Sequence, residues 1–174
     1  MNALEQLLHE VTPLLMGPVL LALVALLVWT LLTAGGFLKE LQERRRANGE
    51  PGLVARFRRE SATAGTDTTS LELLADRCEI DGSRLVTRLN LVARAAPTLG
   101  LMATLIPMGP ALLSLADDDV ESLARSLAVA FTATVAGLLV GLLAAVMGSV
   151  RRQWYASDMV VIDAIVARGA KAVA

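Results

Sequence analysis

Two threonines lie inside long stretches of sequence that contain no ionisable side chain. Thr104 is within the apolar run Ala95–Ala116, and Thr134 is within the apolar run Ser126–Val150. A hydroxyl in such a helix can bond the carbonyl four residues earlier in the same helix, and spacing alone favours this structural interpretation for both threonines. A carbonyl that a proline leaves free needs a hydroxyl, a water or a neighbouring helix as its partner.

The same runs exclude several kinds of chemistry. They contain no Asp, Glu, Lys, Arg or His, whereas proteins that carry protons through a membrane usually keep an ionisable group at depth. The chain alone therefore cannot be the proton carrier, nor an aspartyl or Ser–His intramembrane protease. His9 is the one histidine and Cys78 the one cysteine, so we expect no metal site, no disulfide, no cofactor and no enzyme activity.

Small residues recur every three or four positions in both runs. A helix with such a stripe allows another helix to approach closely, and Gly137 and Gly141 form a GxxxG pair within it. Plain helix packing is the structural interpretation of this pattern, and Pro97, Pro107 and Pro110 predict a kinked second span. The predicted helix-packing stripe consists of Ala96, Gly100, Pro107, Ala111, Ala130, Gly137, Gly141, Ala145 and Gly148.

Three apolar runs are long enough to cross a bilayer, for which about 20 residues are needed. They are Val11–Leu38, Ala95–Ala116 and Ser126–Val150, in a chain of 174 residues with mean hydropathy +0.58. The first run lacks the basic residues that precede the apolar core of a signal peptide, so we expect a retained anchor. The sequence predicts an all-α integral membrane protein with three transmembrane helices and cytoplasmic helical extensions.

Basic residues set the expected orientation. The segment 39–88 carries ten Lys and Arg and the segment after Val150 carries four, whereas none precedes the first run. Asp117, Asp118, Asp119 and Glu121 make the connection between the second and third runs acidic. We expect a multi-pass protein of the cell (inner) membrane, and the charges predict that its N-terminus is outside and its C-terminus in the cytoplasm. Ten basic against nine acidic residues in 39–88 give no nucleic-acid surface.

The segments outside the bilayer are expected to be mostly helical. Asp81, Gly82 and Ser83 predict a break, after which a new helix runs into the second span. The predicted boundaries are an outer amphipathic helix at 1–12, transmembrane helices at 13–38, 89–116 and 123–150, a cytoplasmic helical loop at 39–88, an outer acidic hairpin at 117–122 and a cytoplasmic C-terminal helix at 151–174.

Two motifs resemble those of a known family. Ala96-Pro-Thr-Leu-Gly-Leu-Met-Ala-Thr104 is similar to a motif in the second span of the MotA/TolQ/ExbB proton channel family. Ala130-Phe-Thr-Ala-Thr134-Val-Ala-Gly137-Leu is similar to a motif in the third span. Three spans with the N-terminus outside resemble the ExbB and TolQ branch rather than the four-span MotA branch.

The resemblance implies a membrane subunit that converts ion flow into mechanical work. It implies a homopentameric ring around an ExbD/TolR/MotB-like single-span partner that carries a membrane Asp, with protons or Na+ as the coupling ion. Thr104 and Thr134 would be the pore-facing threonines. Ala103, Pro107 and Val129 depart from the family's usual Gly, Gly and Glu. The altered segment around Pro107 leaves a passive oligomeric membrane scaffold as the alternative.

Overall fold

The computed structural model describes residues 3–46, 52–64, 68–116 and 118–173, which form four helices and no strand. The helices are α1 (Ala3–Arg46), α2 (Gly52–Ala64), α3 (Thr68–Ala116) and α4 (Val120–Val173). α1, α3 and α4 each contain a stretch long and apolar enough to cross a membrane, which confirms the predicted class of fold. Asp117 of the predicted hairpin and the segments 47–51 and 65–67 of the predicted loop lie outside the described residues.

The helices are longer and less interrupted than the sequence predicts. α1 is one helix from Ala3 to Arg46, and α3 is helical on both sides of Pro97, Pro107 and Pro110. The break expected at Asp81–Ser83 is wrong, because α3 runs through this segment. Gly82 serves close packing instead. A Cβ atom on Gly82 would lie 3.2 Å from Cδ2 of Tyr155, so the missing side chain makes room for that ring.

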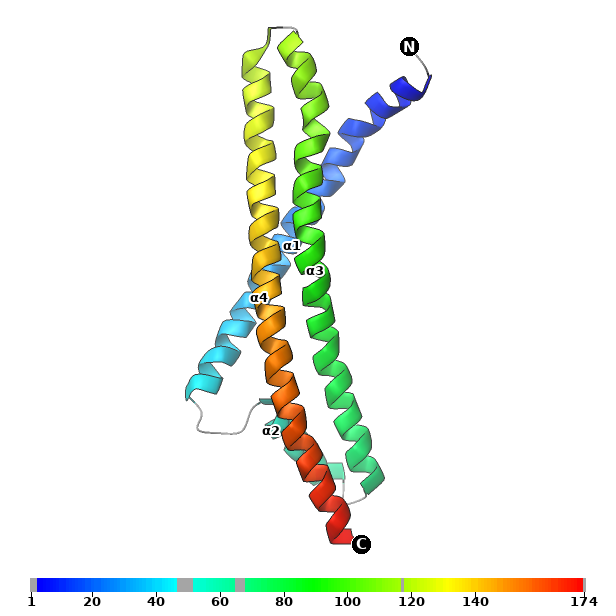
Figure 1. Cartoon of the computed structure of the whole chain (residues 1–174), viewed down its shortest axis with the longest axis vertical. Helices are drawn as coiled ribbons and strands as arrows, with labels where there is room; N and C mark the ends of the chain where they lie inside the picture. The colour runs from blue at the N-terminus through cyan, green and yellow to red at the C-terminus, as the bar shows by residue number, and fades with distance from the viewer. Residues whose placement is uncertain (1–2, 47–51, 65–67, 117, 174) are drawn as a thin grey trace. The chain divides into compact units, whose positions relative to one another are not determined.

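The chain divides into two compact units, and α1, α3 and α4 each contribute to both. The first unit contains Met1–Ala34 and Leu91–Ala145. In it, α3 and α4 run antiparallel and side by side on either side of a tight turn, and α1 crosses them (Figure 1). Val19 of α1 packs on Ala103 of α3 and Ala133 of α4. These small side chains let the three helices meet closely.

The turn between α3 and α4 is built from aspartates. The N–H of Asp119 donates to the Ser114 carbonyl and that of Asp118 to the Leu115 carbonyl, at 2.9 and 3.2 Å. This is the Schellman arrangement, in which the residue after the helix adopts a left-handed conformation. Asp118 occupies that position with φ 60°. The Asp119 carboxylate then accepts from the Ser122 N–H at 3.0 Å and caps α4.

The two aspartates are expected to have opposite effects on stability. Asp118→Gly should raise the free energy of unfolding by about 0.5 kcal/mol, because glycine adopts a positive φ without steric cost. Asp119→Ala should lower it by about 1 kcal/mol, because the first turn of α4 loses its cap. Unfolding by SDS in mixed micelles, followed by circular dichroism, measures both. A loss of stability in Asp118→Gly would contradict the assignment of the turn.

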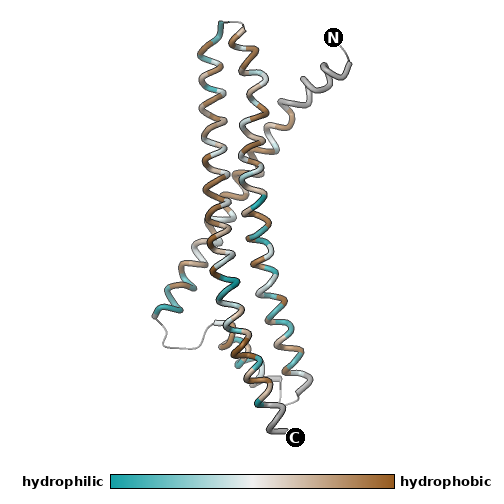
Figure 2. Tube along the Cα trace, viewed as in Figure 1, coloured by the Kyte–Doolittle hydropathy of each residue, from teal (hydrophilic) through white to brown (hydrophobic). Residues whose placement is uncertain are grey.

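The second unit contains Gly35–Asn90 and Val146–Ala174, and its core is built around α2. Hydrophilic residues are frequent in α2, in the first part of α3 and in the last part of α4 (Figure 2). Val54 and Phe57 of α2 are fully buried and pack on a cluster that includes Leu71, Cys78 and Ile162. α2 is therefore a short amphipathic helix held by a small apolar core.

The reactivity of Cys78 measures how tightly this core is packed. Its side chain is buried, and that burial raises the pKa of the thiol, which lowers its thiolate fraction at neutral pH. We expect maleimide to label Cys78 slowly in the intact protein. Phe57→Ala opens the core and should speed labelling about tenfold or more, whereas Leu73→Ala removes an exposed side chain and should not. Equal labelling rates in the two variants would show that α2 does not cover Cys78.

Candidate functional site

The contact between α3 and α4 in the first unit is made by glycine backbones. A Cβ atom on Gly137 would lie 2.7 Å from the carbonyl oxygen of Ala96 and 2.9 Å from the Cα atom of Gly100. A Cβ atom on Gly141 would lie 2.6 Å from Cγ of Pro97. Only glycine fits at Gly137, because its neighbours there are main-chain atoms of the facing helix. The GxxxG pair thus allows the two backbones to touch.

Thr134 links the two helices at this contact. Its hydroxyl donates to the Gly100 carbonyl of α3 at 3.1 Å, so the bond leaves its own helix. The structural interpretation drawn from spacing, a bond to the carbonyl four residues earlier, is therefore wrong for Thr134. The close approach at Gly100 brings the carbonyl within reach, and a carbonyl oxygen has a second lone pair besides the one used in the helix.

Thr104 behaves differently. Its hydroxyl donates to the carbonyl of Leu101, three residues earlier in α3, at 2.7 Å. The own-helix interpretation holds for this threonine, with a partner three rather than four residues away. Both threonines are partly exposed in the chain. Each has its donor engaged and its oxygen lone pairs available as acceptors.

Most of the predicted packing stripe lies on the buried faces of α3 and α4. Ala145 does not, because it is exposed while the neighbouring Ala144 is fully buried. The buried face of α4 drifts slowly round the helix, so the small residues that follow one another in sequence do not all stay on it. The other predicted members are buried, namely Ala96, Gly100, Pro107, Ala111, Ala130, Gly137, Gly141 and Gly148.

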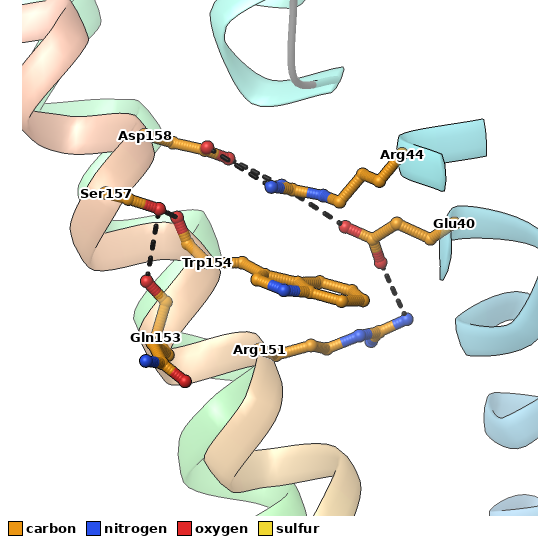
Figure 3. A network of polar contacts seen from close by, with 7 residues as sticks. All are labelled: Glu40, Arg44, Arg151, Gln153, Trp154, Ser157 and Asp158. Carbon is orange, nitrogen blue, oxygen red and sulfur yellow. Dashed lines mark hydrogen bonds and ion pairs between the residues drawn. The ribbon is translucent and has the colours of Figure 1, made fainter. Parts of the chain in front are cut away.

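A charged clamp in the second unit was not predicted from the sequence. Arg44 of α1 forms two bonds with Asp158 of α4, at 2.6 and 3.3 Å, and Asp158 is 1% exposed. Glu40 lies between two guanidinium groups, 3.7 Å from that of Arg44 and 3.2 Å from that of Arg151 (Figure 3). Arg44 and Asp158 are 114 residues apart in sequence. The sequence therefore did not indicate that these opposite charges would form a pair.

Aromatic rings complete the clamp. Trp154 stacks on Phe37 with ring centroids 5.4 Å apart and an angle of 11° between the planes. The guanidinium of Arg44 lies 4.7 Å from the centroid of Trp154, and that of Arg151 lies 5.8 Å from the centroid of Phe37. Each arginine thus has both a carboxylate and a ring as partners, which offsets part of the cost of burying its charge.

The described residues contain no group of three or more His, Cys, Asp or Glu that could hold a metal ion. The burial of Thr30 in α1 was also not predicted from the sequence. Thr30 is 1% exposed, and its hydroxyl has no hydrogen-bond partner among the described residues. The first span is therefore not uniformly exposed to its surroundings, because it is packed at this position.

Comparison with known proteins identifies the family. A model of the MotA/TolQ/ExbB proton channel family matches residues 37–162, more than half of the chain. The matched range includes the glycine contact, Thr104, Thr134 and most of the second unit. No curated protein and no solved structure matches the chain. The family comprises membrane channel proteins rather than enzymes, and the chain belongs to the MotA/TolQ/ExbB proton channel family.

Proposed function

We propose that the chain is the ring-forming subunit of a proton-driven membrane motor. Five copies would surround the membrane helices of a single-span partner of the ExbD/TolR/MotB kind, and proton flow would be converted into movement of one component against the other. The observation that carries the proposal is the bond from Thr134 to Gly100, which places a hydroxyl at a backbone contact within spans that lack any ionisable group.

The partner supplies the charge in this proposal. The three apolar runs offer hydroxyl and carbonyl oxygens but no group that changes protonation near neutral pH. A carboxylate on the partner helix would take up and release the proton. Thr104 and Thr134 would face it, and their free lone pairs would accept a hydrogen bond from its protonated form. An ionised carboxylate has no proton to donate. The threonines would therefore form a hydrogen bond with the protonated form of the partner's carboxyl group but not with its ionised form.

The proposed orientation follows from charge. The basic segment 39–88 and the basic residues after Val150 favour the cytoplasm, and the acidic turn favours the outside. We propose that the chain lies in the cell (inner) membrane with its N-terminus outside and its C-terminus in the cytoplasm. Ser122→Cys in the turn, in a Cys78→Ser background, followed by labelling of intact cells with a membrane-impermeant maleimide, tests it. If residue 122 is labelled only after the cells are opened, the turn lies in the cytoplasm and the orientation is the opposite of the one proposed.

Native mass spectrometry of the complex, purified from membranes through a tag on this chain, tests the assembly. We expect five copies of the chain together with a smaller protein that has one membrane span containing an Asp. A single copy or a dimer would overturn the ring. A partner without a membrane Asp would favour the alternative, a passive oligomeric scaffold, for which the buried Pro107 in place of the family's usual glycine is the supporting observation.

A further inference from the structure

An apolar groove of about 420 Å³ lies between α1 and α4 in the first unit. Leu23, Val24 and Leu27 form its α1 wall, and Ala128, Thr132 and Ala136 are spaced four residues apart along its α4 wall. The hydroxyl of Thr132 donates to the Ala128 carbonyl at 2.8 Å, so no hydrogen-bond donor in this wall needs an outside partner. The groove therefore fits apolar side chains.

A ridge of large side chains lies on α3 in the same unit. Leu101, Leu105, Met108 and Leu112 follow one another at intervals of four, three and four residues, and they are 57, 64, 40 and 59% exposed. The ridge faces away from the side of α3 that carries the buried Ala103, about half a turn round the helix. Groove and ridge thus lie on different sides of the same unit.

The groove and the ridge lie at the same distance from the turn between α3 and α4. Within the α3–α4 hairpin, residues equally far from the turn meet, as Gly100 meets Gly137 and Ala103 meets Ala133. Copies of one membrane protein share one orientation and, around an axis normal to the membrane, one depth. A ridge residue in one copy therefore lies at the same depth as the α4 residue of the next copy that is equally far from the turn. Met108 then stands opposite Ala128, Leu105 opposite Thr132 and Leu101 opposite Ala136.

We propose that this groove receives the α3 ridge of a second copy of the chain. Three large side chains at intervals of four and three residues would enter a groove whose α4 wall has small residues at intervals of four. Membrane helices associate through such packing of large against small side chains, because lipid is as apolar as the residues themselves. Different surfaces of the two copies meet, so the contact repeats from copy to copy and can close into a ring. The inference rests on the proposed ring and names the faces that build it.

Disulfide cross-linking in native membranes tests the pairing. In a Cys78→Ser background, Leu105→Cys combined with Thr132→Cys should give a ladder of cross-linked oligomers after oxidation with copper phenanthroline. Phe131 provides the matched control. It lies next to Thr132 in sequence, is 65% exposed and does not line the groove. Leu105→Cys with Phe131→Cys should give about tenfold less product, because a disulfide tolerates only a narrow range of Cα separations.

The outcomes separate this inference from the proposed function. Equal or greater cross-linking in the control pair, or none in either pair while native mass spectrometry shows an oligomer, would overturn the interface and leave the ring intact. A single copy by mass spectrometry would overturn both.

A second variant needs no new disulfide. Ala136→Leu fills the groove and should reduce the oligomeric fraction several-fold with unchanged helical content, while Phe131→Leu should not. Full assembly of Ala136→Leu would show that the groove holds lipid rather than a second copy.

Discussion

Replacing Gly137 with alanine is expected to separate α3 from α4. The added Cβ atom would lie 2.7 Å from the Ala96 carbonyl oxygen and 2.9 Å from Cα of Gly100, and neither backbone atom can move without its helix. The helices must shift apart, which also lengthens the bond from Thr134 to Gly100. We expect a loss of about 2–3 kcal/mol in the free energy of unfolding, at the upper end for one added methyl group in a packed site.

Gly109 offers the matched control for this change. It lies in α3 of the same unit, and a Cβ atom there would meet nothing within 4 Å. Gly109→Ala should change the stability by no more than about 1 kcal/mol in either direction, because the higher helix propensity of alanine is opposed by the contact of its Cβ atom with the ring of Pro110, the next residue. SDS unfolding in mixed micelles measures both variants. Equal stability of Gly137→Ala and Gly109→Ala would show that the glycine contact is not formed.

Arg44→Ala is expected to cost about 3–5 kcal/mol, because it leaves the buried carboxylate of Asp158 without a partner. Asp158 is 1% exposed, and its two oxygens are each bonded by the Arg44 guanidinium. Removing Arg44 also uncovers one face of Trp154. The same SDS titration measures the loss, and limited proteolysis of α1 beyond the spans should become faster.

Two further variants separate the charge from the packing. Arg44→Met combined with Asp158→Leu removes both charges and keeps apolar contact, so it should recover most of the stability lost in Arg44→Ala. Glu40 stays paired with Arg151 in that variant. Arg125→Ala is the control. Arg125 is 80% exposed, pairs with Glu121 at 2.8 Å, and should contribute nothing measurable. A double variant as unstable as Arg44→Ala would contradict the explanation.

The sequence predicts the spans well because they depend on local composition. Long apolar runs define α1, α3 and α4, and the segregation of basic residues was visible without any structure. The buried faces of α3 and α4 were nearly right for the same reason, since small residues recur at helical spacing. Ala145 and the expected break at Gly82 failed because each depends on which neighbour faces that position, and for Gly82 this is the ring of Tyr155.

The contacts between distant segments could not be predicted. Whether Thr134 bonds its own helix or Gly100 depends on how closely α3 approaches, and Arg44 and Asp158 meet only because α1 and α4 pack together in the second unit. A single sequence states which groups are available and on which face of a helix they lie. The partner that each group finds across helices is set by tertiary packing.

Proton flux through the purified complex, reconstituted in liposomes with its partner, tests the proposed function most directly. An imposed membrane potential drives proton uptake, which a pH-sensitive dye reports. Thr134→Val should reduce the flux several-fold, up to about tenfold, since it removes a hydrogen bond to the protonated carboxyl of the partner that is worth about 0.5–1.5 kcal/mol.

Thr134→Ser keeps the hydroxyl and should keep most of the flux. Thr132→Val removes a hydroxyl that bonds its own helix, and should leave the flux unchanged. Native mass spectrometry of each variant establishes that the complex is assembled. Of these variants, we expect loss of flux in assembled Thr134→Val alone, and full flux in that variant would contradict the proposed function.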